Sequence, residues 1–172
     1  MTQLSSIAIY GPSGAGKTTI SNYLVNQYGY IHCSPGQLCR QVTELLFQSQ
    51  SKQLLNRVND ALKTIDELIW TKAVLASAPP AKPIVYDGLR VVSEFVLFKG
   101  RGFRLWKVEC SLGERVRRLA LRQQTFIVGV DDLHPEEFSL DHLKFDSVIM
   151  NENQQLALLT KAVEEALLAD NR

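Results

Sequence analysis

A glycine-rich stretch near the start of the chain has the spacing of a loop that wraps around phosphate. Residues 11–18 read GPSGAGKT, which is a glycine, four residues and then Gly16, Lys17 and Thr18. Glycines allow successive backbone N–H groups to curl around phosphate oxygens, because no Cβ blocks their approach. This pattern predicts a nucleoside triphosphate site, in which Lys17 reaches the β and γ phosphates and the Thr18 hydroxyl is a ligand of Mg2+.

The predicted ATP contacts come from this phosphate-binding loop (P-loop) and from the helix after it. That helix begins near Lys17 and would point its positive N-terminus at the phosphates. The residues expected to contact ATP here are Gly11, Ser13, Gly14, Ala15, Gly16, Lys17, Thr18 and Thr19. The alternative is a glycine-rich turn without a ligand, which the apolar run before it (residues 7–10) disfavours.

A carboxylate and an arginine follow another apolar run, residues 84–86. Asp87 stands where a parallel sheet near a P-loop presents a carboxylate to Mg2+ or its waters. Arg90 would add positive charge where donor and acceptor phosphates meet. We therefore expect Lys17, Asp87 and Arg90 to be catalytic, and Thr18 and Asp87 to hold the metal. In the alternative interpretation, Asp87 is only a turn residue.

Further arginines have the spacing or the chemistry to contact phosphates. Arg115, Arg118 and Arg122 are spaced i, i+3 and i+7, which places them on one face of a helix. Arg40 offers the paired, planar donors of a guanidinium to a phosphate. For each of them, an exposed basic residue on a helix surface is the alternative.

The elements that must position these residues alternate between apolar runs and helical periodicity, as in a parallel sheet covered on both faces. Strands are predicted at residues 6–10, 30–33, 84–86, 104–110 and 147–150, and helices at 17–28, 93–99, 111–122 and from about 156. The predicted fold class is α/β, with three α/β/α layers around a mostly or all parallel five-stranded sheet.

Residues 36–76 carry two apolar stripes at helical spacing and lack a strand signal, which predicts a helical insertion beside the sheet. The stripes are Leu38, Val42, Leu45 and Leu46, and then Val58, Leu62, Ile65 and Ile69. A length of 172 residues fits one domain. We expect a core at residues 1–34 and 82–172, an acceptor-binding insertion at about 35–78, and a lid at about 122–140.

Composition limits the class of protein. The formal net charge is only +1, so no global field favours binding to nucleic acid or to a membrane. We expect nucleic acid at most as a substrate. Three cysteines without metal spacing suit reduced cytosolic thiols. Apolar runs fall far below the ~18 residues of a membrane span, and the start of the chain lacks a signal pattern. We expect a cytoplasmic protein; its oligomeric state cannot be read from the sequence.

The segment HCSPGQLCR, residues 32–40, resembles the segment that opens the nucleoside monophosphate site in the adenylate kinase family. In that family a serine, a glycine and a trailing arginine hold the acceptor phosphate. Pro35 and Gln37 replace the family's usual threonine and aspartate. The acceptor-binding residues that the resemblance implies are Ser34, Gly36, Arg40 and Arg90.

Two later segments resemble kinases of the same superfamily. YDGLR, residues 86–90, is similar to the DGxxR of adenylate kinases, one residue shorter, and to the D-x-R of phage-type deoxynucleoside monophosphate kinases. FDSVIMN, residues 145–151, resembles the last strand and base loop of the phage-type enzymes and of animal-type phosphomevalonate kinases. By this resemblance Arg118 stacks on adenine, Arg122 clamps the transferring phosphoryl group, and Asn151 borders the adenine.

The order of these motifs implies a P-loop kinase of the nucleoside monophosphate kinase type, with ATP and Mg2+ as cofactors. It would transfer the γ-phosphoryl group to a (deoxy)nucleoside monophosphate, with Lys17, Arg40, Arg90 and Arg122 around that group. Residues 125–139 have the composition of a mobile loop, whose closing would exclude water.

Two alternatives stay open at this stage. One is a kinase with another acceptor, such as dephospho-coenzyme A, phosphomevalonate or a hydroxyl on a modified base in DNA. Asp87 would then be the best-placed general base for a hydroxyl acceptor. The other alternative is a nucleotide-binding regulator with slow NTPase activity.

Overall fold

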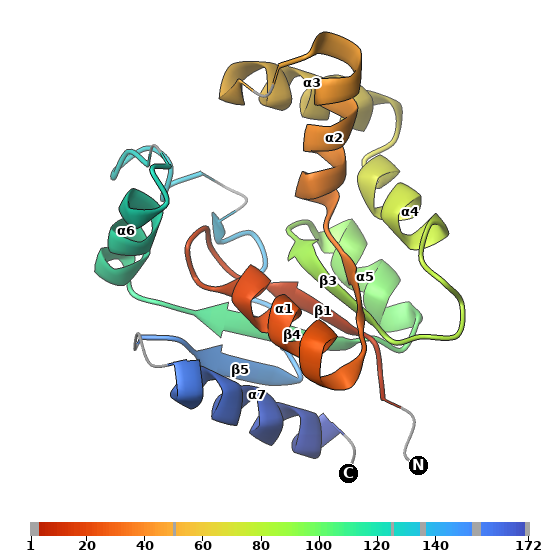
Figure 1. Cartoon of the computed structure of the whole chain (residues 1–172), viewed down its shortest axis with the longest axis vertical. Coiled ribbons are helices and arrows are strands. Elements are labelled where there is room, and N and C mark those ends of the chain that lie inside the picture. Colours follow the sequence, from red (N-terminus) through yellow and green to blue (C-terminus); the bar gives the residue numbers. More distant parts are fainter. Residues whose placement is uncertain (1–3, 50, 125, 135–136, 153–155, 171–172) are drawn as a thin grey trace.

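Five parallel strands form the centre of the molecule. The computed structural model describes residues 4–49, 51–124, 126–134, 137–152 and 156–170. The strands are β1 (Ile7–Tyr10), β2 (Ile31–Cys33), β3 (Ile84–Leu89), β4 (Arg104–Glu109) and β5 (Ser147–Met150). They lie in the order β2-β3-β1-β4-β5, and every pair is parallel. The predicted α/β class with an all parallel five-stranded sheet is confirmed (Figure 1).

Helices cover both faces of this sheet, because successive side chains of a strand point to opposite faces. The covering helices are α1 (Lys17–Tyr28) and α7 (Leu156–Asp170) on one face, and α4 (Ile69–Ala76) and α5 (Val92–Gly100) on the other. In β1, Ile7 and Ile9 pack with α1 and α7, whereas Ala8 and Tyr10 belong to the second core with α4 and α5. Trp70 and Trp106 are buried residues of the core.

The chain between β2 and β3 is helical, as predicted, but it contains three helices. These are α2 (Pro35–Phe47), α3 (Lys52–Ile65) and α4, which share a small core of Cys39, Val58 and Trp70. The expected second stripe breaks at Asp66, whose backbone is extended and whose carboxylate accepts a hydrogen bond of 2.9 Å from Leu68 N.

The expected burial of Leu45 and Leu46 is wrong, since they are 82% and 62% exposed at the end of α2. The core that α2 shares with α3 and α4 reaches only as far along this helix as Val42. The last turn of α2 therefore has nothing apolar to pack against and projects into solvent.

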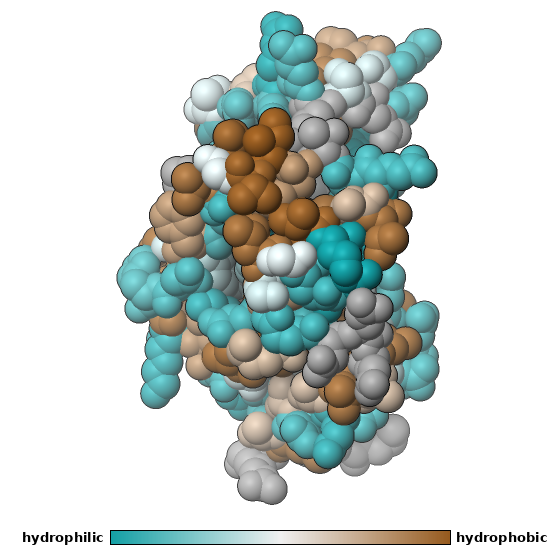
Figure 2. Space-filling model, turned by 90° about the vertical axis from the view of Figure 1, so that its left-hand side faces the viewer, coloured by the Kyte–Doolittle hydropathy of each residue, from teal (hydrophilic) through white to brown (hydrophobic). Residues whose placement is uncertain are grey.

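Helix α6 (Leu112–Leu121) and the turns after it stand opposite α2 and α3 (Figure 1). The described residues of the predicted lid form turns, and residues 125, 135 and 136 lie outside the described part. A view from this side shows an apolar area on the surface (Figure 2). The exposed apolar side chains of α6 and the following turns include Leu121, Ile127, Val128, Val130 and Leu133. Within the described residues, no helix is long and apolar enough to cross a membrane.

Candidate active site

The P-loop connects β1 to α1 at the carboxyl edge of the sheet. Gly16 precedes α1 with a φ of 107°, in the left-handed region that favours glycine. A Cβ added to Gly16 would lie 2.3 Å from Asn151 Nδ2, so only glycine fits here. The loop is thus a closely packed cradle of backbone N–H groups that ends at a helix N-terminus, which is the arrangement that binds phosphate.

Lys17 folds back over this loop. Its Nζ donates hydrogen bonds to the carbonyl oxygens of Gly11 at 2.5 Å and Pro12 at 3.0 Å. Burial and the nearby charge of Arg90 lower the pKa of Lys17 to about 7, although the carboxylate of Glu137 acts in the opposite direction. A bound polyphosphate would stabilise the ammonium form, because an opposite charge favours the charged state.

Thr18 and Asp87 meet as the predicted metal-binding pair. The strand β3 extends beyond the expected residues 84–86 as far as Leu89, so Asp87 lies within it and is 8% exposed. The Thr18 hydroxyl donates a hydrogen bond of 3.1 Å to Asp87 Oδ2. Two oxygen ligands side by side suit Mg2+, which takes oxygen donors and keeps several waters.

Asp87 also has a neighbour that the sequence did not single out, His32 at the end of β2. His32 Nε2 lies 2.9 Å from Asp87 Oδ2, although it has no well-aligned hydrogen-bond partner among the described residues. Burial raises the pKa of Asp87, yet His32 and the hydroxyls of Ser34 and Thr18 outweigh it and hold the pKa below its usual value. Asp87 is therefore a stable carboxylate anion.

Arg90 is fixed at the end of β3 by a buried carboxylate. Glu94 Oε2 accepts a hydrogen bond of 2.8 Å from Arg90 N, and Glu94 Oε1 accepts bonds of 2.6 Å from the hydroxyls of Thr71 and Tyr86. These bonds join α4, β3 and α5, so the backbone of Arg90 cannot shift without breaking a buried network. The guanidinium then extends towards the P-loop, where it contacts Glu137 at 3.2 Å.

Two arginines of α6 brace the back of the P-loop. Arg115 Nε donates to Ser13 O at 2.8 Å, and Arg118 donates to Asn151 O at 2.9 Å and, more weakly, to Ala15 O at 3.3 Å. The Asn151 amide donates to Ala15 O at 2.7 Å. The ATP-site residues Arg118 and Asn151 thus lie against the loop, and their predicted contacts with adenine remain predictions.

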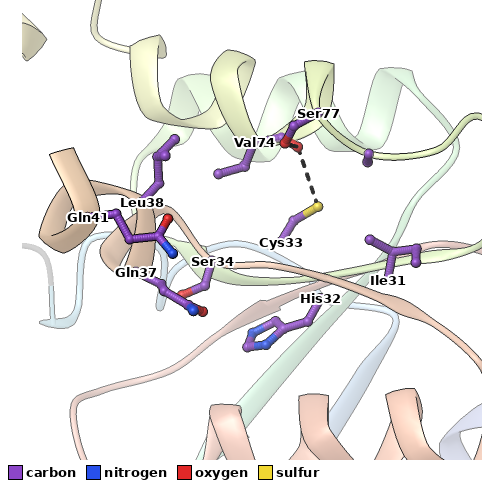
Figure 3. A pocket seen from close by; sticks show the side chains of 10 residues that line it. Ile31, His32, Cys33, Ser34, Gln37, Leu38, Gln41, Val74 and Ser77 are labelled. Atoms are coloured by element: carbon purple, nitrogen blue, oxygen red, sulfur yellow. Dashed lines mark hydrogen bonds between the residues drawn. The ribbon is translucent and has the colours of Figure 1, made fainter. Parts of the chain in front are cut away.

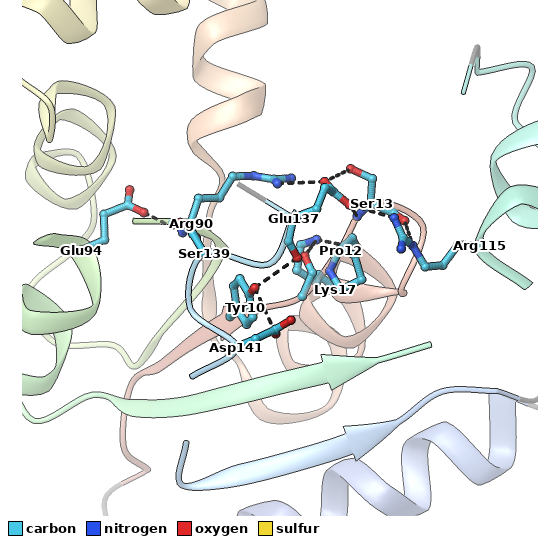
Figure 4. A network of polar contacts seen from close by, with 11 residues as sticks. Tyr10, Pro12, Ser13, Lys17, Arg90, Glu94, Arg115, Glu137, Ser139 and Asp141 are labelled. Carbon is cyan, nitrogen blue, oxygen red and sulfur yellow. Dashed lines mark hydrogen bonds and ion pairs between the residues drawn. The ribbon is translucent and has the colours of Figure 1, made fainter. Parts of the chain in front are cut away.

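Glu137 lies at the centre of the polar network drawn in Figure 4. Its carboxylate accepts hydrogen bonds from Ser13 N and Oγ, at 2.8 and 2.9 Å, and forms ion pairs with Arg90 and Arg115 at 3.2 and 2.8 Å. The side chain is 8% exposed. The loop between α6 and β5 therefore supplies a buried anion to the phosphate-binding groups.

Of the predicted acceptor residues, Arg90 belongs to this network, whereas Arg40 lies apart from it, as does the predicted clamp Arg122. Arg40 is exposed on α2, with its guanidinium near Gly36, and Arg122 is the exposed C-cap of α6. Neither side chain forms a hydrogen bond or ion pair with any residue that the structure describes. Ser34 precedes α2 and lies beside Asp87. Of the predicted phosphate contacts, the P-loop, Asp87 and Arg90 converge, whereas Arg40 and Arg122 stay outside.

A cavity of about 310 Å³ adjoins the acceptor segment. Its lining residues are Ile31, His32, Cys33, Ser34, Gln37, Leu38, Gln41, Val74, Ser77 and Ala78. They come from β2, from α2 and from α4 and the residues just after it (Figure 3). This lining contains no Lys, Arg, Asp or Glu. The cavity suits an uncharged part of a ligand that offers hydrogen bonds.

The sequence did not identify His32 and Glu137 as site residues, and it gave Arg115 no role of its own. Arg115 was on the predicted arginine face, but the resemblance directed attention to Arg118 and Arg122. The alternation of side chains in β2 could have indicated that His32 and Cys33 face opposite sides of the sheet. Nothing in the sequence pointed to Glu137 as a site residue, because one acidic residue in a polar loop is ordinary.

The fold and the site together define a class. A P-loop between the central strand and its helix, with Thr18 and Asp87 paired at the edge of an all parallel sheet, is the arrangement of a P-loop nucleotide-binding protein. A family model described as an AAA domain matches residues 7–126. The chain belongs to this family.

The chain is also similar, over short stretches, to cytidylate kinases. It is 41% identical over 61 residues to the cytidylate kinase of Caldicellulosiruptor saccharolyticus, covering 36% of this chain and 26% of that protein. It is 57% identical over 37 residues to the one of Caldicellulosiruptor bescii, covering 22% and 16%. These matches thus span about a quarter or less of the length of these relatives.

Solved structures share the fold over nearly the whole chain. A gluconokinase from Sinorhizobium meliloti 1021 superimposes with a TM-score of 0.62 at 16% identity, covering 99% of this chain and 97% of that one. The shikimate kinase from Acinetobacter baumannii gives 0.58 at 14% identity, covering 97% and 93%. At these identities the solved structures show that the fold is shared. The family match and the stretches similar to cytidylate kinases bear out the predicted resemblance to the P-loop nucleoside monophosphate kinase superfamily.

Proposed function

We propose that the chain transfers the γ-phosphoryl group of ATP to the phosphate of a (deoxy)nucleoside monophosphate and so forms the diphosphate. The observation that carries this proposal is the convergence of three cations from separate elements. Arg90 and Arg115 both pair with Glu137 at the P-loop, at 3.2 and 2.8 Å, and Lys17 lies near enough for both arginines to lower its pKa. Glu137 pairs with two of these side chains, and its single charge cannot neutralise all three, so the cluster is suited to hold further anions.

Transfer between two phosphates is the reaction that such a cluster serves best. It brings together two highly charged anions, and its transition state spreads negative charge over the transferring group. The protein then has little covalent chemistry to do. Lys17, Arg90 and Arg115 would hold both phosphates in line and neutralise their charge, which is catalysis by positioning and electrostatics.

The state of Asp87 favours a phosphate acceptor over a hydroxyl acceptor. A hydroxyl acceptor benefits from a general base whose pKa is near the working pH, whereas several contacts hold the pKa of Asp87 low. A low-pKa carboxylate is a poor base but a suitable partner for a cation. Thr18, and Asp87 through water, would hold Mg2+, which supplies charge neutralisation at the β and γ phosphates when bound.

The acceptor is proposed to bind between α2, α4 and the end of β3. Its base would enter the neutral cavity, and its phosphate would meet Arg90 near Ser34 and Gly36. Arg40 reaches this phosphate in the proposal only if its side chain moves away from Gly36, where a Cβ added to the glycine would lie 4.0 Å from the guanidinium nitrogens. The local similarity to cytidylate kinases supports an acceptor of this class.

The remaining parts of the chain complete the proposal. Residues 1–172 act as one kinase domain, in which the helices within 35–78 bind the acceptor and residues 122–140 form the lid. Arg118 and Asn151 border the adenine, and Arg122 turns inward when the lid closes. The apolar side chains that the described lid exposes, Ile127 and Val128 among them, are 55% accessible each and would gain cover on closure.

A hydroxyl acceptor is the second candidate, and one observation favours it. His32 lies 2.9 Å from Asp87, so a histidine–aspartate pair stands beside the proposed acceptor site. Structural neighbours that share the fold include proteins titled shikimate kinase and gluconokinase. In this alternative, the acceptor would be a small polyol acid or another alcohol, and the pair would take up its proton.

The test is ADP formation from ATP and Mg2+ with a panel of acceptors. The panel contains ribo- and deoxyribonucleoside monophosphates, dephospho-coenzyme A, phosphomevalonate, shikimate, gluconate and hydroxymethylated DNA. Lys17→Ala serves as the inactive variant, and Lys161→Ala, which removes a 73% exposed lysine of α7, as the matched active control.

The proposal expects ADP only with a nucleoside monophosphate, for the unaltered chain and for Lys161→Ala. Activity with only the alcohols would replace it by the second candidate. Equal ADP release with and without every acceptor would indicate a slow NTPase that acts as a regulator.

A further inference from the structure

The carboxylate of Glu137 lies where the P-loop would hold an anion. It accepts two hydrogen bonds from Ser13, through the backbone N–H at 2.8 Å and the hydroxyl at 2.9 Å. It also pairs with Arg90 at 3.2 Å and with Arg115 at 2.8 Å, and its side chain is 8% exposed. Four donors from three elements therefore converge on one carboxylate.

The same donors are those expected to bind the end of a polyphosphate chain. A carboxylate and a phosphate oxygen carry similar charge and accept the same charge-assisted hydrogen bonds from N–H groups and guanidinium. Ser13 belongs to the predicted ATP contacts, and Arg90 to the proposed meeting point of the two phosphates. Glu137 and a terminal phosphate thus need the same donors and cannot both use them.

The backbone around Glu137 is docked rather than loose. The Tyr10 hydroxyl at the end of β1 donates to Glu137 O at 3.1 Å, and the Ser139 hydroxyl donates to Arg90 O. The Tyr10 ring also stacks on Phe145, with ring centroids 5.4 Å apart. These anchors hold the segment against the ends of β1 and β3, so the Glu137 side chain can leave the P-loop by rotation while its backbone stays in place.

We propose that Glu137 is a positioning residue that takes the place of the terminal phosphate of ATP in the empty P-loop and is displaced when ATP binds. Until then, it keeps Arg90 and Arg115 paired and unavailable to an acceptor phosphate. ATP releases both arginines by replacing the carboxylate. The role of the released arginines rests on the proposed function, whereas the competition with ATP does not.

This exchange has two consequences. The chain binds ATP less tightly than its P-loop alone would, because each binding event must break the contacts of Glu137 first. The penalty falls on the terminal phosphate, so it is larger for ATP than for ADP and absent for AMP. An order of binding follows as well, because the acceptor phosphate meets free arginines only after ATP is bound.

The experiment measures nucleotide affinity by calorimetric titration without any acceptor. Glu137→Gln keeps the shape of the side chain and removes its charge. We expect this variant to bind ATP ~10-fold more tightly, with a smaller gain for ADP and none for AMP. The matched control is Asp141→Asn, in the same segment. Asp141 contacts Tyr10 and Lys107 but not the P-loop, so its removal should change ATP affinity by less than ~2-fold.

A structural brace and a phosphate substitute predict opposite signs. If Glu137 only stabilised the loop, Glu137→Gln would bind ATP as weakly as or more weakly than the unaltered chain, and that result would overturn the inference. Thermal unfolding with and without ATP gives a second readout. The variant should melt lower when empty, because two arginines lose their partner, yet gain more from ATP.

Glu137→Asp keeps the charge on a shorter side chain and provides a variant less prone to unfolding. It should bind ATP with an affinity between those of the unaltered chain and Glu137→Gln; an affinity tighter than that of Glu137→Gln would contradict the inference. Phosphoryl transfer is measured separately. If the unaltered chain transfers no phosphoryl group but Glu137→Gln binds ATP more tightly, only the proposed function is overturned. If the unaltered chain transfers normally but Glu137→Gln binds ATP no more tightly, only this inference is overturned.

Discussion

The donor and acceptor sides of the site are built in contrasting ways. Around the P-loop, neighbouring side chains are fixed by short hydrogen bonds: Asn151 donates to Ala15 O at 2.7 Å, and Arg115 donates to Ser13 O at 2.8 Å. On the acceptor side, Arg40 is exposed, the end of α2 projects into solvent, and residues of β2, α2 and α4 line a cavity of about 310 Å³.

This difference shows on which side of the site substrate binding requires side chains to move. The donor side is preorganised, so ATP meets groups that are already in position and pays for little ordering beyond the displacement of Glu137. Arg40 on the acceptor side has to change position before it can contact a phosphate. Substitutions on the donor side should therefore act on ATP and on rate together, and those on the acceptor side on the acceptor alone.

The largest effect is expected at Lys17, the residue that both sides depend on. Lys17→Ala removes a charge aimed at the transferring group, and kcat/KM should fall on the order of 100- to 1,000-fold. Steady-state ADP formation measures this, and circular dichroism checks that the variant folds. Full activity in a folded variant would contradict the P-loop assignment itself.

A pair of glycines compares the two sides directly. A Cβ at Gly16 would lie 2.3 Å from Asn151 Nδ2 and in a left-handed backbone, whereas the nearest atoms to a Cβ at Gly36 are 4.0 Å away, on the flexible end of Arg40. Gly16→Ala should weaken ATP binding about 10- to 100-fold, since distortion of the loop costs charge-assisted hydrogen bonds. Gly36→Ala should leave ATP affinity within about 2-fold. Equal losses in a titration would show that the donor side is no tighter than the acceptor side.

Arg40→Ala isolates the acceptor side. The KM for the acceptor should rise about 10-fold, the effect of one charge-assisted contact, and the KM for ATP should change by less than about 2-fold. The comparison needs initial rates over both substrate concentrations. A matching rise for both substrates would move Arg40 out of the acceptor site.

The smallest effect is expected in the pH dependence of stability. Burial raises the pKa of Glu137, but Ser13 N and Arg90 outweigh it, so the folded pKa lies below the usual value. Glu137 therefore stabilises the fold above its unfolded pKa of about 4.3, and this contribution is lost as the pH falls through the folded pKa.

Glu137→Gln should accordingly lower the free energy of unfolding by about 1–2 kcal/mol near pH 7, and the difference from the unaltered chain should shrink towards pH 3. Urea denaturation at a series of pH values measures it. Asp66 on the acceptor side has a pKa lowered mainly by its bond with exposed Lys72, so Asp66→Asn provides the comparison and should alter the profile less. A constant difference across pH would contradict the role of the Glu137 charge.

The features of the fold and of the site that could be predicted are those that depend on residues close together in the sequence. The P-loop is a contiguous motif, and each strand of an all parallel sheet is a short apolar run, so both follow from spacing alone. The end of β3 was misplaced because Asp87 and Gly88 look like a turn. In the structure Leu89 still pairs with Tyr10, across a register shift in which Tyr86–Leu89 of β3 faces Ala8–Tyr10 of β1, and this pairing between distant segments extends the strand.

The parts that could not be predicted depend on contacts between segments far apart in the chain. Glu137 meets Ser13 across more than a hundred residues, and His32 meets Asp87 only because β2 and β3 are neighbours. The resemblance implied that Arg118 and Arg122 contact ATP, and these contacts stay predictions. It could not tell that Arg115, rather than Arg122, would reach the P-loop, because register along a helix depends on how the helix packs.

The close approach of β3 to the start of α2 has a mechanical consequence. A Cβ on Gly88 would lie 2.6 Å from Pro35 Cδ, so the residue after Asp87 and the first residue of α2 are in direct van der Waals contact. A tilt of α2 towards β3 would therefore push on the strand that carries Asp87. A movement of the acceptor-side helices would thus reach Asp87 through the direct contact between Pro35 and Gly88.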